Sequence, residues 1–418
     1  MKEPKIRFKG FEGEWEKVKL GDVGIFKSNG VDKTIHNNEK IVNLLNYLDV
    51  YNARLVTKNN CHQLMHVSAS DRQIKECDIQ MNDVFFTPSS ETAEDIGHVL
   101  VIKETLPNTC YSYHLLRYRP NKGIFYGDFP NYGFATKFVR SQMRLLAKGV
   151  QRYVIGKSEF ESIVVQIPSI SEQQSIASYF QHLDSLIQST TKKIESLKQV
   201  KAASLQSMFP QEGETTPRVR FKGFEGEWEK VKFGEIAKIS RGLTYSPFNL
   251  RDKGVRVLRS SNIDEDVFVI SESDVFVNKE CINIEYAEDG NILVTAANGS
   301  PRLVGKHAII NNIGTNPTVV GGFMLLISSN ESAFLNASMS SIWYSNFLKV
   351  GVSGGNGAIG NLSKQDLEDT ELLIPNKKAE RNHIATYFTS LDRQITLQTQ
   401  RLEKLKQIKA ACLDNMFV

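Results

Sequence analysis

The string FKGFEGEWEKVK occurs at Phe8–Lys19 and again, without a change, at Phe221–Lys232. The wider match joins Pro4–Val23 to Pro217–Ile236, with 15 of 20 positions identical. A repeat of about 210 residues is far longer than a solenoid unit, which has about 20 to 50 residues. The sequence therefore predicts a tandem duplication of a whole domain, in which each half has its own beginning and end.

Each half also closes on a similar segment, Glu172–Phe209 in the first half and Glu380–Phe417 in the second, with a shared LKQ(V/I)KAA run. The SEQQ motif at Ser171 is a capping box, in which the serine oxygen accepts a backbone N–H and Gln174 reaches back, so a helix is predicted to start there. Apolar residues then recur at alternating spacings of four and three, which is typical of a coiled-coil seam. Each helix is expected to span about 37 residues, or ~55 Å at about 1.5 Å per residue.

The two seams indicate an antiparallel pair of helices. Each seam has one polar break at its midpoint, Thr190 in the first and Gln398 in the second. An antiparallel pairing without stagger brings the two breaks together, and the mismatch fixes the register at some cost in stability. Two separate amphipathic helices, each packed on its own domain, are the alternative. The residues predicted to pair the helices are Ile176, Phe180, Leu183, Ile187, Thr190, Ile194 and Leu197 in the first segment and Ile384, Phe388, Leu391, Ile395, Gln398, Leu402 and Leu405 in the second.

Paired in this way, the helices are expected to place two related domains at opposite ends, about an approximate twofold axis. For a duplex ligand this geometry corresponds to a dimeric DNA reader fused into one chain, whose half-sites lie about 34 to 36 Å apart. Because the domains differ in sequence, the half-sites are expected to differ as well. The predicted layout is a first domain at 1–167, a central long helix at 168–210, a linker at 211–216, a second domain at 217–375 and a C-terminal long helix at 376–418.

The blocks between the shared borders, 24–165 and 237–373, have no common run longer than a few residues. Short β-like runs alternate with polar loops and helical candidates in both blocks, which predicts a mixed α+β fold. Shared borders around divergent contents favour two recognition modules over a duplicated enzyme, which would be expected to keep a reactive cluster. The expected strands lie in Asp83–Thr87, His98–Ile102, Ser162–Ile167, Val255–Ser260, Asn291–Thr295, Phe323–Ser328 and Glu371–Pro375, and the expected helices in Thr136–Lys148 and Ser338–Val350.

The composition is that of an ordinary globular protein, with 418 residues, 41% of them hydrophobic and 23% charged. No apolar run approaches the ~20 residues of a membrane helix, and the first residues, MKEPKIRFKG, lack a signal-peptide stretch, so a cytoplasmic location is expected. The five cysteines show no CxxC spacing, which gives no indication of a disulfide framework or a zinc site. A net charge of +4 permits a nucleic-acid partner without requiring one.

Three strings imitate catalytic motifs. GNGAIG at Gly355–Gly360 fits GxGxxG, but the segment that follows has no apolar helix face and no acidic residue about 20 positions on. GKS at Gly156–Ser158 lacks the first glycine of a P-loop, because Gln151 stands in its place. NPTV at Asn316–Val319 echoes the asparagine-proline tetrad of adenine methyltransferases but lacks the aromatic residue that stacks on the base. No HExxH motif and no nuclease-like cluster of acids plus lysine stands out either, so the chain is predicted to have no catalytic site, metal or cofactor of its own.

Loops rich in arginine, lysine, asparagine, glutamine and serine beside an aromatic residue are suited to phosphates and base edges. Segments of this kind occur in both blocks. For each residue taken singly, a solvated surface side chain is the alternative. The candidate DNA-contacting residues are Ser89, Ser90, Glu91, Lys137, Arg140, Gln151, Arg152 and Tyr153 in the first block and Arg241, Tyr245, Arg259, Ser261, Asn262, Asn298, Ser300 and Arg302 in the second.

The duplicated WEKVKLGD-type openings, the IP…EQ…IA.YF…LD pattern of the long helices, the GDIL-like turn at Asp289–Leu293 and the divergent blocks together resemble the specificity subunit of type I restriction-modification systems, in the form typical of Gram-positive bacteria. The resemblance covers nearly the whole chain. It implies two target recognition domains on antiparallel helices, each reading one half of a bipartite double-stranded DNA sequence. It also implies two methyltransferase subunits that bind S-adenosylmethionine and two restriction subunits that use ATP and Mg²⁺, so that catalysis belongs to the partners.

Two rival interpretations stay open at this point. A self-contained methyltransferase or nuclease would modify or cut DNA unaided, once S-adenosylmethionine or a metal is supplied. A scaffold of two protein-binding or glycan-binding modules on a coiled coil would give no salt-sensitive gel shift with duplex DNA.

Overall fold

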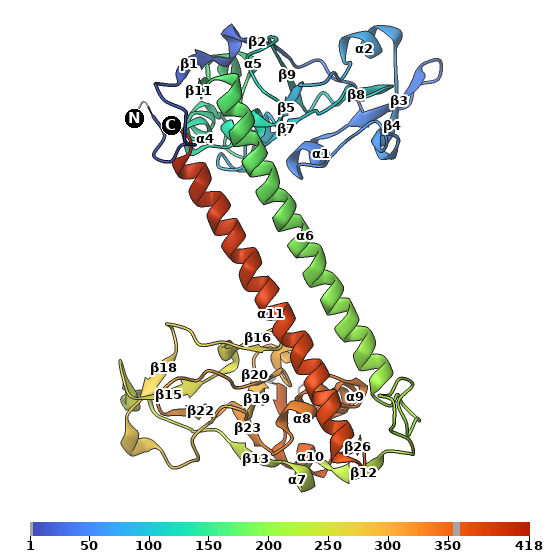
Figure 1. The fold of residues 1–418 in the computed structure, drawn as a ribbon, viewed down its shortest axis with the longest axis vertical. Coiled ribbons are helices and arrows are strands. Elements are labelled where there is room, and N and C mark those ends of the chain that lie inside the picture. The colour runs from blue at the N-terminus through green and yellow to red at the C-terminus, as the bar shows by residue number, and fades with distance from the viewer. Residues whose placement is uncertain (1–2, 354–359) are drawn as a thin grey trace. The chain divides into compact units, whose positions relative to one another are not determined.

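The computed structural model describes residues 3–353 and 360–418. The chain divides into two compact units, one formed by Met1–Thr191 together with Gln400–Val418 and the other by Lys192–Thr399 (Figure 1). Each unit combines mainly antiparallel sheets with helices, so the predicted mixed α+β class is confirmed. Among the described residues, no helix combines the length and the apolar character that crossing a membrane requires.

The first unit contains two main sheets. The larger, antiparallel sheet has the strand order β2–β9–β5–β7, and the smaller one has the order β4–β3–β8, in which β3 and β8 are parallel. Two further antiparallel pairs are β1–β11 and β6–β10. The strands are β1 Glu16–Lys19, β2 Gly24–Lys27, β3 Lys40–Leu45, β4 Met65–Ala69, β5 Val84–Phe86, β6 Ser89–Ser90, β7 Val99–Val101, β8 Thr109–Tyr111, β9 Leu116–Pro120, β10 Tyr153–Val154 and β11 Val164–Ile167. The short helices are α1 Tyr47–Tyr51, α2 Asp71–Glu76, α3 Phe129–Gly133, α4 Lys137–Leu146 and α5 Lys157–Ser162.

Aromatic side chains of the larger sheet form the centre of the first unit. Phe26 on β2 stacks on Tyr118 of the neighbouring strand β9, with ring centroids 4.5 Å apart, and lies 6.1 Å from Phe86 on β5. All three rings are almost completely buried. Burial of side chains of this size stabilises a fold by about 1.5 to 3 kcal/mol each, so the sheet and the segments packed on it form one core.

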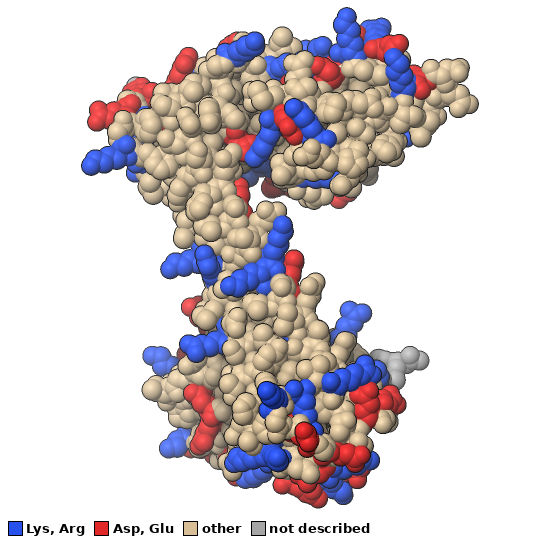
Figure 2. All heavy atoms as spheres, turned by 45° about the vertical axis from the view of Figure 1, so that its right-hand side comes forward, with Lys and Arg blue, Asp and Glu red and all other residues tan. Residues whose placement is uncertain are grey.

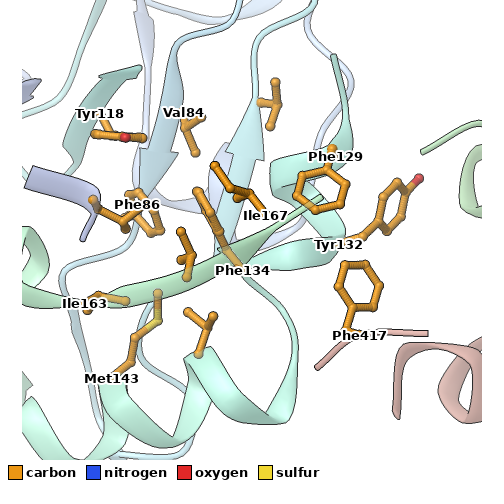
Figure 3. Packing of buried hydrophobic residues seen from close by; sticks show 14 of the residues in the cluster. Val84, Phe86, Tyr118, Phe129, Tyr132, Phe134, Met143, Ile163, Ile167 and Phe417 are labelled. Carbon is orange, nitrogen blue, oxygen red and sulfur yellow. The ribbon is translucent and has the colours of Figure 1, made fainter. Parts of the chain in front are cut away.

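The last residues of the chain complete this same core. Figure 3 shows Phe417 next to Phe129 and Tyr132 of the first unit, and its ring centroid is 5.9 Å from that of Phe129. The backbone N–H of Ile6 donates to the carbonyl of Asn415 at 2.9 Å. The beginning and the end of the chain therefore belong to one unit.

The second unit has the antiparallel sheet β13–β23–β19–β21 and the mixed sheet β14–β18–β15–β22, in which β15 and β22 are parallel. Smaller sheets are β12–β26, β16–β17 and β20–β25–β24. The strands are β12 Glu229–Lys232, β13 Lys238–Arg241, β14 Leu250–Arg251, β15 Val255–Leu258, β16 Ile263–Asp264, β17 Val267–Phe268, β18 Val275–Val277, β19 Ile292–Thr295, β20 Ala297–Asn298, β21 His307–Ile309, β22 Thr318–Val320, β23 Met324–Ser328, β24 Val352–Ser353, β25 Gly360–Leu362 and β26 Glu371–Ile374. The short helices are α7 Phe233–Ile236, α8 Ser332–Met339, α9 Ile342–Gly351 and α10 Lys364–Asp369.

The two units share a topology, although the divergent blocks 24–165 and 237–373 have no common sequence run longer than a few residues. In the first, β3 pairs in parallel with β8, and Leu45 lies opposite Tyr111. In the second, β15 pairs in parallel with β22, and Leu258 lies opposite Val320. The larger sheets correspond strand by strand as well. The duplication visible at the borders of the sequence therefore extends through the divergent blocks, where only the backbone pattern is kept.

Two long helices, α6 (Ile170–Met208) and α11 (Lys378–Asn415), close the two halves of the chain. Within the first unit, the beginning of α6 lies against the end of α11. The hydroxyl of Tyr179 is 3.4 Å from Sγ of Cys412, and the ring of Phe180 is 6.0 Å from that of Phe417.

Within the second unit, the order is reversed, and the beginning of α11 lies against the end of α6. The hydroxyls of Ser204 and Tyr387 are 2.8 Å apart, and Nζ of Lys201 is 2.7 Å from Oδ1 of Asp392. The two helices therefore run antiparallel inside each unit.

The predicted seam residues near each helix start lie in the cores of the units, where the globular part and the partner helix meet. Thr190, the predicted polar break of α6, donates its hydroxyl to the carbonyl of Leu186 at 2.7 Å, so this polar group is satisfied within its own helix. The buried seam residues are Ile176, Phe180, Leu183, Thr190 and Ile194 in α6 and Ile384, Phe388 and Leu391 in α11.

The predicted capping box at the start of α6 is wrong by two residues. The helix begins at Ile170, and Oγ of Ser169 accepts the N–H of Glu172 at 3.4 Å. Ser171 is already inside the first turn, and Gln174 is exposed. Ser169 therefore takes the N-cap role that was predicted for Ser171, because its hydroxyl accepts one of the first N–H groups of the helix.

The expected strands are confirmed as β5, β7, β11, β15, β19, β23 and β26, and the first expected helix as α4 with Thr136 as its N-cap. The second expected helix, Ser338–Val350, is wrong in its extent. The chain there forms α8, which ends at Met339, and α9, which begins at Ile342. The N–H of Ser341 turns back to the carbonyl of Ser338, which interrupts the helical pattern.

The residue directly before each copy of the repeated string, Arg7 or Arg220, connects each unit to its long helix through an ion pair that occurs twice. Arg7 contacts Glu172 through Nε and Nη2, both at 2.8 Å, and the second copy pairs Arg220 with Glu380, with Nη2 at 2.8 Å. Both glutamates occupy the third position of their helix, and their side chains are only 2% and 1% exposed. A carboxylate at this position also benefits from the positive end of the helix dipole. The shared sequence thus encodes a shared joint.

Candidate nucleic-acid interface

A pocket of about 730 Å³ opens at one edge of the second unit. It lies between the loop after β13, the loop after β15 and strand β20. Three of the residues predicted to contact DNA, Tyr245, Arg259 and Asn298, line it together, although more than 50 positions separate the first from the last. The pocket therefore brings an aromatic ring, a guanidinium and an amide into one place.

Close backbone packing forms the base of this pocket. The N–H of Leu243 donates to the carbonyl of Val320 at 2.7 Å, which ties the loop after β13 to the end of β22. A Cβ on Gly242 would lie 1.9 Å from the carbonyl oxygen of Gly321, so any side chain there would collide with the backbone. Glycine at position 242 therefore permits the approach that shapes the pocket.

Arg259 directly follows β15, and its side chain is only weakly engaged within the chain. Its backbone N–H donates to Oδ1 of Asn262 at 2.8 Å, while Nη2 reaches the carbonyl of Ser273 at a long 3.4 Å. Its Nε is buried without a partner, and within the described part of the chain no carboxylate forms an ion pair with it. By contrast, the guanidinium of the nearby Arg256 is 3.3 Å from Asp274. Arg259 thus keeps donor capacity that a ligand can use.

Exposed aromatic side chains surround the mouth of the pocket. Phe323, one of the lining residues, is 69% exposed, and Phe248 is 90% exposed between the lining residues Pro247 and Leu250. Flat aromatic rings at a polar site are suited to contact with bases or sugars of a nucleic acid.

The first unit has a corresponding edge, built from β6, β10 and the residues after β3. Tyr153 lies opposite Ser90 in the β6–β10 pair, and Nη2 of Arg152 donates to Oγ of Ser89 at 3.0 Å. The hydroxyl of Tyr47 donates to the carbonyl of Ser89 at 2.9 Å. Four of the predicted residues, Ser89, Ser90, Arg152 and Tyr153, therefore come together.

Sequence reasoning missed an aromatic cluster at this edge. The rings of Tyr47 and Tyr51 stack at 5.9 Å, and Tyr51 is 4.4 Å from the ring of His98. His98 donates to Asp95 at 2.9 Å, and this hydrogen bond lowers the pKa of the Asp95 carboxyl, while burial raises the pKa of Tyr47. The spacing of four between Tyr47 and Tyr51, which places them on one helix face, was the available signal.

Three predicted residues have structural roles, and these predictions are corrected. Asn262 is 1% exposed, and its amide donates to Val269 and Asp274 while its oxygen caps Arg259. Ser90 is buried, and its hydroxyl donates to the carbonyl of Thr92. Burial lowers the pKa of the Arg140 guanidinium, which holds the loop after β6 by donating to the carbonyls of Glu94 and Ile96. The Asn262 amide has no free donor left, and the hydrogen bonds of Ser90 and Arg140 hold the loop after β6 in place, so a structural role accounts for all three side chains.

The remaining predicted residues do not line the pocket themselves. Lys137 is exposed at the start of α4, and its Nζ is 2.6 Å from Oδ2 of Asp414. The backbone N–H of Ser300 donates to Oδ1 of Asn298 at 2.9 Å, next to the pocket. The others are exposed, and they are Glu91 and Gln151 in the first unit and Arg241, Ser261 and Arg302 in the second.

The strings that imitate catalytic motifs have other roles or lie outside the description. NPTV is a turn into β22, in which the hydroxyl of Thr318 donates to the carbonyl of Asn316. Gly156–Ser158 begins α5, and of GNGAIG only Gly360 lies within the described residues. In the part of the chain that the structure describes, no group of three His, Cys, Asp or Glu side chains is placed to hold a metal ion.

Charge on the surface is interspersed. Figure 2 shows Lys and Arg side chains in separate groups on the visible face of each unit, with Asp and Glu beside several of them. The fold and the two corresponding polar edges define a protein that consists of two related recognition domains.

The chain belongs to the type I restriction modification DNA specificity domain family, whose sequence model matches residues 12–199 and 225–407. It is thus a specificity subunit of a type I restriction-modification system. The putative type I restriction enzyme MjaX specificity subunit of Methanocaldococcus jannaschii is 21% identical over 341 residues, covering 79% of this chain and 76% of that protein. The EcoKI specificity subunit of Escherichia coli K12 is 22% identical over 308 residues, covering 69% and 65%.

Solved structures show the same fold at low sequence identity. The type I restriction-modification S subunit from M. genitalium aligns with a TM-score of 0.63 at 13% identity, covering 100% of this chain and 99% of that one. A chain from a structural study of complex assembly and conformational transition of the type I system aligns with a TM-score of 0.52 at 15% identity, covering 96% and 97%. The predicted family is confirmed.

Proposed function

We propose that this chain reads an asymmetric bipartite DNA target, with each recognition domain reading one half. One observation carries the proposal. The two units share a topology and a strand register, yet different side chains stand at corresponding positions of the polar edge, with Asn46 and Tyr47 in the first and Arg259 and Ser260 in the second. A common backbone with different polar side chains presents two different hydrogen-bonding surfaces, which select different bases.

The long helices have the second role in this proposal. They set the number of base pairs between the half-sites and assemble two methyltransferase subunits. Their antiparallel course inside each unit, with the repeated Arg–Glu joint at both helix starts, supports this role. The joint must be rigid, because movement between a domain and its helix would change the distance between the two half-sites that the domains read.

The chemistry belongs to the partner subunits in this proposal. The two methyltransferase subunits bind S-adenosylmethionine, and two restriction subunits use ATP and Mg²⁺. This chain contributes sequence recognition and assembly, as a non-catalytic subunit with no cofactor of its own. Family membership supports this division of labour.

A domain exchange tests the proposal. Residues 237–373 are replaced by the same block of another family member with a different target, and the exchanged chain is produced with its partner subunits. Long-read sequencing of the methylated host DNA reads out the target. We expect one half of the methylated sequence to change and the other half to stay as it was. An unchanged target, or a change in both halves, would contradict the separate reading by two domains.

A second experiment addresses the scaffold alternative. The reconstituted complex of this chain with its methyltransferase subunits is titrated with duplex DNA at several salt concentrations. A reader of duplex DNA loses affinity steeply with salt, because each neutralised phosphate releases a counterion. A complex whose affinity does not change with salt would favour a protein or glycan ligand.

A further inference from the structure

Arg259 and Asn46 occupy the same place in their respective units. Each directly follows the strand that pairs in parallel, β15 or β3, and each has its backbone N–H capped by a side chain three residues on. Arg259 donates to Asn262 at 2.8 Å, and Asn46 donates to Asp49 at 2.9 Å. The backbone at the two positions is therefore equivalent, and only the side chains differ.

In the first unit, the side chains at this position and the next one, Asn46 and Tyr47, form hydrogen bonds within the chain. The Oδ1 atom of Asn46 accepts the N–H of Tyr47 at 2.8 Å, and the Tyr47 hydroxyl donates to the carbonyl of Ser89. The strand register makes Ser260 the counterpart of Tyr47 and Ala297 the counterpart of Ser89. The second unit therefore has no counterpart of the hydrogen bond from Tyr47 to Ser89, because Ser260 is too short to form it. Ser260 and Ala297 both line the pocket.

The side-chain amide of Asn298, another polar group that lines the pocket, already makes hydrogen bonds within the chain. The amide nitrogen of Asn298 donates to Oγ of Ser260 at 3.2 Å, and its oxygen accepts the N–H of Ser300 at 2.9 Å. Asn298 therefore lacks the free pair of donor and acceptor that reads an adenine. The guanidinium of Arg259, which also lines the pocket, has unused donors, since its Nε has no hydrogen-bond partner and its Nη2 only a long contact.

From this arrangement we propose that Arg259 is a specificity-determining residue that reads a guanine in the half-site of the second domain. The inference rests on the proposed function. A guanidinium presents two parallel N–H donors, and the major-groove edge of guanine presents two acceptors, O6 and N7, at matching spacing. Adenine, cytosine and thymine each lack this pair of acceptors, so the second half-site contains an obligatory G·C pair.

The test uses the full chain produced with its methyltransferase subunits and a plasmid library with randomised half-sites. Long-read sequencing reports the methylated motif for the wild type, R259Q, R259K and the control R218Q. The Arg218 side chain is 66% exposed, precedes the divergent block 237–373 and does not line the pocket. Substitution of Arg259 leaves the backbone cap by Asn262 in place, because the donor is a main-chain N–H.

We expect R259Q to lose discrimination at one G·C position of the second half-site by about 5- to 150-fold, with the first half-site unchanged. The unchanged first half-site shows that the variant is folded and assembled. R259K is expected to relax the same position, because an ammonium lacks the planar fork, whereas R218Q keeps the whole motif.

A wild-type second half-site without a required G·C pair would overturn the inference. The inference would also be overturned if R259Q kept the full motif, or if R259K kept it when R259Q is inactive. Either result would mark Arg259 as a phosphate contact or a structural residue. Loss of all methylation in both variants also counts against it, because a single base contact leaves part of the library methylated. A wild-type motif that is not bipartite would instead refute the proposed function, and this inference with it.

Discussion

The ion pair between Arg220 and Glu380 is expected to be worth far more than its surface neighbours. The Glu380 side chain is 1% exposed, and the side chain of Arg220 is 17% exposed. In R220A, the carboxylate of Glu380 stays buried and loses the guanidinium that contacted both of its oxygens. Removal of one partner of a buried pair costs about 3 to 5 kcal/mol, chiefly because the remaining charge is uncompensated.

The chain offers a matched control two residues away. Arg218 pairs with Glu214 at 3.0 Å, but its side chain is 66% exposed. An exposed pair of this kind contributes about 0 to 1 kcal/mol, so R218A is expected to be close to neutral. Both variants remove one arginine from the same segment, and the two ion pairs differ in the burial of both partners.

The magnitude translates into a measurable thermal shift. For a unit of about 200 residues, 1 kcal/mol shifts the midpoint by about 2 to 4 °C, so R220A is expected to lower the transition of the second unit by about 6 to 20 °C. Scanning calorimetry measures the midpoints, and hydrogen exchange assigns each transition to its unit. The double variant R220A/E380A should regain part of the loss, because it removes the uncompensated charge. Equal midpoints for R220A and R218A would refute the reasoning.

Three further predictions concern the core, the pocket and a surface loop. F417A is expected to destabilise the first unit by about 3 to 5 kcal/mol in urea denaturation, because the ring of Phe417 packs among Phe129, Phe180 and Trp15. As a control, F248A removes a side chain that is 90% exposed and should change stability by less than about 0.5 kcal/mol. Similar values for the two variants would contradict this packing. G242A is expected to lower the free energy of unfolding by about 1 to 3 kcal/mol, because its Cβ would collide with the carbonyl oxygen of Gly321. G299A serves as the control, since a Cβ there has no atom within 4 Å. An unchanged stability of G242A would refute the close approach of the backbone. The pKa of Glu159 is lowered to about 2, mainly by the hydrogen bond from Lys148, so the stabilisation is present above the unfolded pKa of about 4.3 and is lost as the pH falls toward 2. In K148A the pKa of Glu159 should rise in an NMR titration, whereas K157A, which removes the partner of Glu161, should leave it unchanged; no rise in K148A would exclude Lys148 as the cause.

Much of the organisation could be predicted from short-range patterns. The identical strings at Phe8–Lys19 and Phe221–Lys232 revealed the duplication, and the apolar spacing after Glu172 revealed a long helix. Strand positions such as Val84–Phe86 and Ile292–Thr295 followed from apolar β-like runs. The helix and the strands depend on neighbours within a few residues, and the duplication is a direct match of letters, which is why a single sequence displays all of them.

The composition of the candidate site could be predicted only in part. Arg259, Tyr245 and Asn298 were singled out from loop chemistry, but not the pocket they share. Asn262 belonged to the same kind of loop and is instead a buried cap, while Tyr47 was not selected and lies at the centre of the first edge. Composition cannot tell a polar side chain that caps its own backbone from one that is free, because both occur in the same turns.

The sequence by itself determined that the chain is a duplicated recognition protein with two long helices, because a repeated string can be found by comparing letters and the apolar periodicity is a property of neighbouring residues. The tertiary structure decided that the divergent blocks share one strand register, that Phe417 completes the core of the first unit, and that Arg259 stands where the first unit has Asn46. Each of these depends on pairing between residues far apart in the chain, where backbone hydrogen bonds set the partners and the side chains are free to differ.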